Sequence, residues 1–112
     1  MIVTDNETEV LNKVADICSE VFNIPKEYLN HISKDREVTL FRHTFYWIMR
    51  KYHPNVTLKK IGLFTKRDHA SVIHGAQKIN DRIETNDPDC ELILKAKEVY
   101  VSRNVKHQLS VA

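Results

Sequence analysis

The stretch "TKRDHASVIHGAQKI", residues 65–79, places cationic, acidic, imidazole and hydroxyl side chains at the predicted start of a helix. A helix N-terminus offers free N–H groups and a partial positive charge to a phosphate. Beside it, Asp68 can accept a hydrogen bond from cytosine, and His69 or Ser71 can bond to a base edge. Arg67 can reach a guanine or a phosphate. These residue types are therefore compatible with contact to duplex DNA.

The helical periodicity of this stretch separates an apolar stripe from a polar side. Apolar residues recur at spacings of three and four, and the predicted stripe contains Val72, Ile73, Ala76, Ile79 and Ile83. The opposite side collects Arg67, Ala70, Ser71, His74, Gln77, Lys78 and Asp81. A plainer interpretation is also open, in which Asp68 and Ser71 only cap the helix and the histidines are solvated. Periodicity alone does not decide between the two.

The elements that position this stretch are all predicted to be helical. Apolar spacing and capping residues predict helices at about Thr8–Phe22, Val38–Tyr52, Thr57–Phe64, Asp68–Asn86 and Asp87–Arg103, with a short helical turn at "NIPKEYLN". The segment "HISKDRE" is a polar, cation-bearing link. With only 2 Gly and 3 Pro, the chain has little material for the tight turns of a β-sandwich. We therefore expect a small all-α, multi-helix domain.

Two of the predicted helices, within about residues 57–86, are separated by only a few residues. A short helix, a brief connection and a longer capped helix are typical of a helix-turn-helix unit. A chain of 112 residues has room for one modest core, so we assign residues 1–104 to a single domain. The polar residues 105–112 are expected to form a disordered tail.

The formal net charge of +2 permits a polyanionic partner without requiring one. Cys18 and Cys90 lack the spacing of metal ligands, which favours two buried, reduced thiols. No apolar run is long enough to span a bilayer, and the N-terminus lacks the features of a signal peptide. We therefore expect a cytoplasmic protein without membrane contact.

The string "KRDHASVIHGAQKI" closely resembles the signature of the C-terminal DNA-binding domain (domain IV) of the bacterial replication initiator DnaA. The likeness extends through "TLKKIG", which resembles the first helix of that family's helix-turn-helix, and through "KDREV" and "FRH", which resemble its basic loop and the following helix. It covers about Glu9 to Glu84. The resemblance implies a helical fold of the DnaA C-terminal, Trp-repressor-like kind, and sequence-specific binding of double-stranded DNA.

The resemblance also implies roles for individual residues. Lys34 and Arg36 of the basic loop would enter a minor groove. Phosphates would be held by Arg42, His43, Arg50, Leu58 and Lys59, and the DNA backbone would be touched by His74 and Lys78. Base edges in the major groove would face Asp68, His69, Ala70 and Ser71. Arg67 would lie at the mouth of the groove, and Lys66 is also expected to bind DNA.

The sequence departs from the family pattern at a few positions. Ala70 stands where the family usually has a hydroxyl, so a methyl contact to thymine would replace a polar base contact and alter the preferred site. The link "LFTK" before Arg67 is one residue shorter than the family's glycine-containing link, which puts the turn geometry in question. Lys34 stands in place of an Arg, which keeps the charge but loses the planar fork.

A glycine-rich phosphate-binding loop with Lys-Ser/Thr is absent from the sequence, so we expect no nucleotide site and no ATPase activity in this chain. The chain resembles a freestanding DNA-binding domain, as a phage, a mobile element or an accessory protein would encode, or a fragment of a larger protein. Its expected partners are double-stranded DNA and replication, phage or mobile-element proteins. Its expected role is in replication initiation or its regulation.

A metal site or a hydrolase is one alternative, because the chain has 6 histidines. However, His69 and His74 are five residues apart, whereas metallopeptidase helices use i and i+4 with an intervening Glu. We therefore expect no metal, no cofactor and no enzyme activity. A helical protein-interaction module or a transcriptional regulator is the other alternative, since "FYWIM", residues 45–49, offers apolar surface. Such aromatic clusters more often form the core of a small α domain.

Overall fold

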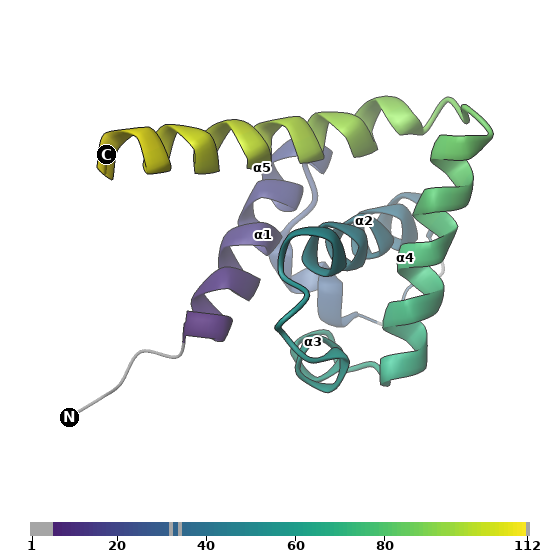
Figure 1. The fold of residues 1–112 in the computed structure, drawn as a ribbon. Helices are drawn as coiled ribbons and strands as arrows, with labels where there is room; N and C mark the ends of the chain where they lie inside the picture. Colours follow the sequence, from purple (N-terminus) through teal and green to yellow (C-terminus); the bar gives the residue numbers. More distant parts are fainter. Residues whose placement is uncertain (1–5, 32, 34, 112) are drawn as a thin grey trace.

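The computed structural model describes the backbone of residues 6–31, 33 and 35–111, and the side chains of these residues up to residue 103. Within this part of the chain the elements are helical, in the order α1 (Asn6–Phe22), η1 (Lys26–Asn30), α2 (Arg36–Tyr52), α3 (Leu58–Phe64), α4 (His69–Glu84) and α5 (Cys90–Val111). In Figure 1, α2 lies at the centre, with α4 along one side, α3 at the lower end and α5 across the top. The predicted all-α class is confirmed.

Helix α2 supplies much of the core, because apolar side chains cover several of its sides. Residues 45–49, "FYWIM", are all buried, with exposed fractions between 0 and 6%. They pack with Leu11 and Val14 of α1 and with Ile93 of α5, which are each at most 1% exposed. Burying such a side chain contributes roughly 1.5–3 kcal/mol. The segment is therefore core, as the sequence favoured, and does not offer a docking surface.

Helix α4 packs directly on α2 at a glycine. A Cβ atom at Gly75 would lie 2.7 Å from the imidazole Cδ2 of His43 and 2.8 Å from Cδ2 of Tyr46. Val72 and Ile79, both fully buried, lie on the same face of α4. Ile73, which we had placed in the apolar stripe, is 38% exposed because it lies at the edge of this face. The glycine therefore allows the backbone of α4 to pack closely against the side chains of α2.

Helices α3 and α4 begin at the capping residues that the sequence predicts. Thr57 Oγ1 accepts from Lys60 N at 3.1 Å, and Asp68 Oδ1 accepts from Ser71 N at 2.9 Å, so both predicted caps are confirmed. Helices α1 and α2 each begin two residues before the predicted start. For α2 the reason is Asp35, whose carboxylate accepts from Glu37 N at 2.9 Å and caps the helix.

The turn between α3 and α4 is closed despite its shortened link. Arg67 N donates to Gly62 O at 2.8 Å, and Thr65 N donates to the same carbonyl at 3.1 Å. Thr65 is fully buried, and its hydroxyl lies 2.7 Å from the Tyr46 hydroxyl in a hydrogen bond that ties the turn to α2. Lys66 adopts a φ of 56°, the left-handed conformation that glycine commonly takes after a helix. The chain thus forms the turn without the glycine.

Helix α5 is longer than the sequence indicated. It contains 22 residues and continues to Val111, whereas we predicted an end near Arg103 and a disordered tail at residues 105–112. Residues 105–111 contain neither Gly nor Pro to end the helix, and the domain boundary near residue 104 stays a prediction. None of the helices in the described residues is both long and apolar enough to cross a membrane.

We predict that Gly62→Ala destabilises the protein by about 1–3 kcal/mol, the usual cost of overpacking. The added Cβ would lie 2.5 Å from the backbone carbonyl oxygen of Arg67, so the turn would have to open. Urea denaturation measures the change. Leu63→Ala is the control, because Leu63 is adjacent and 69% exposed. An equal effect of both substitutions would contradict the proposed clash.

We predict that Lys66→Gly stabilises the protein by about 0.5–1 kcal/mol, because glycine adopts a positive φ without steric cost. Lys66→Ala is the matched comparison, since it removes the same charge but keeps a Cβ in the left-handed region. It should give no gain in the free energy of unfolding. If both variants were stabilised equally, the loss of charge and not the backbone conformation would be the cause.

Candidate nucleic-acid interface

The first turn of α4 is anchored by Asp68. Its Oδ1 accepts from the backbone N and from the hydroxyl of Ser71, both at 2.9 Å. These two hydrogen bonds lower the pKa of Asp68, so the side chain is a carboxylate at neutral pH. Both bonds use Oδ1, and the side chain is exposed, so the cap leaves Oδ2 as an acceptor towards solvent. Asp68 therefore combines capping with the acceptor function that the sequence predicted.

The polar side of α4 faces solvent along the length of the helix. His69, Ala70, His74 and Lys78 are exposed, and Ser71, which bonds to the cap, is partly buried. The structure therefore brings the four predicted base-reading residues, 68 to 71, together at one exposed helix end. Small side chains at Ala70 and Ser71 let the helix backbone approach a groove closely. That these residues touch bases stays a prediction.

Arg67 joins the recognition turn to the segment before α2. Its Nη2 donates to the carbonyl oxygen of His31 at 2.8 Å, and Nη2 of Arg42 donates to the same oxygen at 3.3 Å. The His31 ring in turn stacks on Tyr28, with ring centres 4.6 Å apart. His31 therefore connects η1, α2 and the start of α4 just where the basic loop begins.

Arg42, which is predicted to bind a phosphate, is buried. Its exposed fraction is 6%, and its Nε has no hydrogen-bond partner among the residues that the structure describes. Burial, together with the charge of Arg67, lowers the pKa of Arg42. Its phosphate contact stays a prediction. In the structure, Arg42 donates a hydrogen bond to the carbonyl oxygen of His31.

His43 lies half-buried between α2 and α4, stacked on Tyr46. Burial lowers the pKa of His43 to about 4, and the charges of the nearby Arg42, Lys78 and Arg82 act in the same direction. The imidazole is therefore neutral at physiological pH. A phosphate contact by His43, as predicted, would then be a hydrogen bond and not an ion pair.

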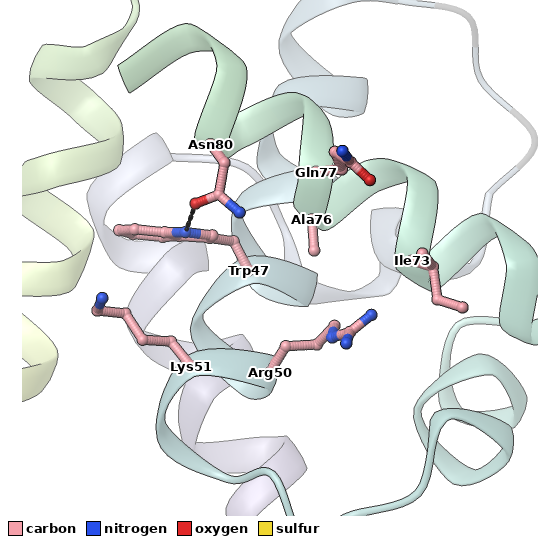
Figure 2. Close-up of a pocket in the computed structure, with 7 residues that line it drawn as sticks. All are labelled: Trp47, Arg50, Lys51, Ile73, Ala76, Gln77 and Asn80. Carbon is pink, nitrogen blue, oxygen red and sulfur yellow. Dashed lines mark hydrogen bonds between the residues drawn. The ribbon is translucent and has the colours of Figure 1, made fainter. Parts of the chain in front are cut away.

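Arg50 lines a cleft of about 370 Å³ between the other flank of α4 and the end of α2. Figure 2 shows Arg50 and Lys51 on α2 below Ile73, Gln77 and Asn80 of α4. In this cleft Trp47 Nε1 donates to Asn80 Oδ1 at 2.9 Å, and Lys51 Nζ lies over the indole ring of Trp47. Its lining residues carry positive but no negative charge, so the cleft favours anions.

The remaining predicted residues lie around these two flanks. Lys59 in the first turn of α3 and Lys66 in the turn are exposed. Leu58 is the first residue of α3 and packs against the core, so it can meet a phosphate only through its backbone N–H. Lys34 lies outside the described residues.

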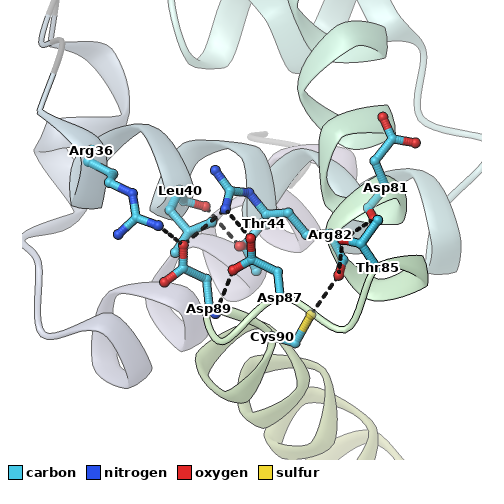
Figure 3. A network of polar contacts seen from close by, with 9 residues as sticks. All are labelled: Arg36, Leu40, Thr44, Asp81, Arg82, Thr85, Asp87, Asp89 and Cys90. Carbon is cyan, nitrogen blue, oxygen red and sulfur yellow. Dashed lines mark hydrogen bonds and ion pairs between the residues drawn. The ribbon is translucent and has the colours of Figure 1, made fainter.

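Arg36 was predicted to enter a minor groove, but it is engaged elsewhere. Its Nη2 forms an ion pair with Asp89 Oδ2, and Arg82 binds the same oxygen at 2.9 Å (Figure 3). Sequence reasoning missed this contact because Asp89 is 53 positions away along the chain. It also missed the bond between Tyr46 and Thr65, although a Tyr inside an apolar segment signals that its hydroxyl needs a partner.

A short turn, a capped and exposed second helix, and cations on both of its flanks together define a helix-turn-helix domain. The sequence pattern of the family described as "Bacterial dnaA protein helix-turn-helix" matches residues 11–79. The chain belongs to this family and is a DnaA-like DNA-binding domain.

Individual relatives agree with this assignment. The chain is 34% identical over 91 residues to the chromosomal replication initiator protein DnaA of Oleidesulfovibrio alaskensis, which covers 81% of this chain and 19% of that protein. It is 30% identical over 81 residues to the DnaA of Desulfotalea psychrophila, covering 72% of this chain and 17% of the relative. The DnaA of Onion yellows phytoplasma is 28% identical over 92 residues, covering 80% of this chain and 18% of the relative. The chain thus spans about a fifth of the length of these relatives.

We predict that the free energy of unfolding falls as the pH falls from about 6.5 to about 4, with a contribution from His43 on the order of 1–3 kcal/mol. The folded-state pKa of His43 is about 4, below that of an unfolded histidine, so in this window the unfolded chain binds more protons. Stability is therefore lost as His43 is forced to take up a proton.

Urea denaturation at about pH 7.5 and about pH 4.5 measures this difference. In His43→Gln the pH dependence should shrink, because the side chain no longer titrates. His69→Gln is the control, because it makes the same substitution at an exposed position. An unchanged pH dependence in His43→Gln would contradict the assignment.

Proposed function

We propose that this chain binds double-stranded DNA sequence-specifically in replication initiation or its regulation. The start of α4 enters the major groove, and Lys34 in the basic loop before α2 enters the adjacent minor groove. The observation that carries this proposal is the end of α4, where Asp68 caps the helix and the side chains of Asp68, His69 and Ala70 are exposed to solvent. The match to the DnaA helix-turn-helix family supports the same role.

The arrangement of charge supports a division of labour between bases and phosphates. His74 and Lys78 lie near His43 on one flank of α4, whereas Arg50 lies in the cleft on the other flank. Two DNA strands border a major groove, so cations on both flanks can hold phosphates of both strands while the helix end reads bases. Contacts to phosphate supply affinity and orientation, and the few polar residues at positions 68–71 supply the sequence preference.

ATP hydrolysis is no part of the proposed activity of this chain. Its sequence lacks a glycine-rich phosphate loop, it matches only about a fifth of each relative, and its residues 11–79 match the helix-turn-helix family. The name chromosomal replication initiator, which the relatives carry, supports a role in replication for this chain. The interaction-module alternative is weakened by the burial of residues 45–49, on which it rested.

The proposal is tested by selecting bound sites from random duplexes and then titrating the selected duplex and a scrambled one. His69→Ala and Asp68→Ser should reduce discrimination between the two duplexes by about 1–3 kcal/mol, because each removes a base contact. Asp68→Ser is used because Ser keeps the helix cap, which Ala would lose. Ala70→Ser should alter the preferred site.

Lys59→Ala and Lys34→Ala should weaken binding to both duplexes equally. Each should also reduce the slope of log K against log salt by about 0.9, the value for one phosphate contact. Uniform losses from the base-reading and phosphate-binding variants would show that the roles are assigned wrongly. A wild-type protein that binds no duplex at low salt would refute the proposed function.

A further inference from the structure

The turn between α4 and α5 places two carboxylates beside the predicted DNA surface. Asp89 Oδ2 accepts from Arg36 Nη2 at 2.5 Å and from Arg82 Nη1 at 2.9 Å (Figure 3). Asp87 Oδ2 lies 3.3 Å from the same Nη1 of Arg82. Arg36 is the first residue of α2 and directly follows the basic loop and its cap, Asp35. The carboxylate of Asp89 therefore forms an ion pair with Arg36, which lies next to that loop.

The position of Asp89 is fixed by several contacts other than the one with Arg36. Its backbone N donates to Asp87 Oδ1 at 2.8 Å, and Cys90 N donates to Asp87 O at 2.9 Å. The Asp89 side chain is 20% exposed and that of Arg82 is 29% exposed. The carboxylate therefore stays in place whether or not Arg36 is bound to it.

Arg36 is held much less firmly than its partner. Its side chain is 71% exposed, and an exposed ion pair is weak because solvent screens it. Arg36 can thus leave Asp89, but a phosphate that takes it must come close to a fixed negative charge. Repulsion between the two anions opposes that approach.

We propose that Asp89 sets the DNA affinity of this chain by keeping Arg36 out of the set of phosphate contacts. This inference rests on the proposed function and assigns Asp89, which touches no DNA itself, the role of an affinity-limiting residue. Arg36 in the wild-type protein is already neutralised, so it releases few counterions when DNA binds. Removing the charge of Asp89 makes Arg36 available as one further phosphate contact.

The test uses Asp89→Asn, which keeps the shape of the side chain and an acceptor oxygen but removes its charge. Its association constant for the selected duplex and for a scrambled duplex should rise several-fold at low salt. The slope of log K against log salt should steepen by about 0.9, which corresponds to an extra loss of about 3.5-fold between 50 and 200 mM salt. Both duplexes should respond equally, because a phosphate contact carries no sequence information.

Asp81→Asn is the matched control for net charge. Asp81 is exposed on α4, and Figure 3 shows its carboxylate directed away from the contacts of Asp89. It removes one negative charge without releasing Arg36, so it should leave the salt slope unchanged. The double variant Arg36→Ala/Asp89→Asn should lose the gain of Asp89→Asn. Arg36→Ala alone should leave the slope at its wild-type value.

The inference is overturned if Asp89→Asn matches Asp81→Asn, if its gain survives in the double variant, or if it weakens binding. A slope reduced by about 0.9 in Arg36→Ala alone would overturn it too, because Arg36 would then already contact phosphate. This last measurement does not need Asp89→Asn to fold, and thermal melting checks the fold of every variant. A wild-type protein that binds no duplex would refute the proposed function. If the wild-type protein binds DNA but Asp89→Asn changes neither the affinity nor the salt slope, only this inference is refuted.

Discussion

The close packing of α4 on α2 is the constraint on which the rest of the interface depends. At Gly75 the two helices approach until only a hydrogen atom fits between the α4 backbone and the rings of His43 and Tyr46. Tyr46 also bonds to Thr65 in the turn, and Trp47 bonds to Asn80 further along α4. The central helix α2 thereby fixes the tilt of α4, the turn that precedes α4 and the position of its middle part. The cations on α2 acquire fixed positions relative to that helix for the same reason.

Local features of this fold could be predicted from the sequence, because their causes lie within a few residues. The caps at Thr57 and Asp68, the buried positions Val72 and Ile79, and the exposed helix end all follow from short-range spacing. The end of α5 could not be located, since residues 104–111 contain no residue that terminates a helix. A polar composition there was compatible with a helix as much as with a tail.

The neighbours of the cations could not be predicted, because they depend on packing between distant segments. The sequence indicated that Arg42 and Arg67 are basic residues near a groove, but not that both donate to His31 O. Family resemblance also gives roles without neighbours, so it could not show that Arg36 meets Asp89. The shortened link was a different case: its closure became evident only from the backbone bonds around Gly62 and the positive φ of Lys66.

The chain contains 1 tryptophan, Trp47 of α2. Its indole N–H donates a hydrogen bond to Asn80 of α4, and both residues line the cleft between the two helices. Indole fluorescence depends on the polarity and hydrogen bonding around the ring. Any movement of Asn80 or of Lys51 over the ring would therefore change the emission of an otherwise buried fluorophore. The protein thus carries an intrinsic optical reporter of the geometry between its two central helices, which requires no attached dye.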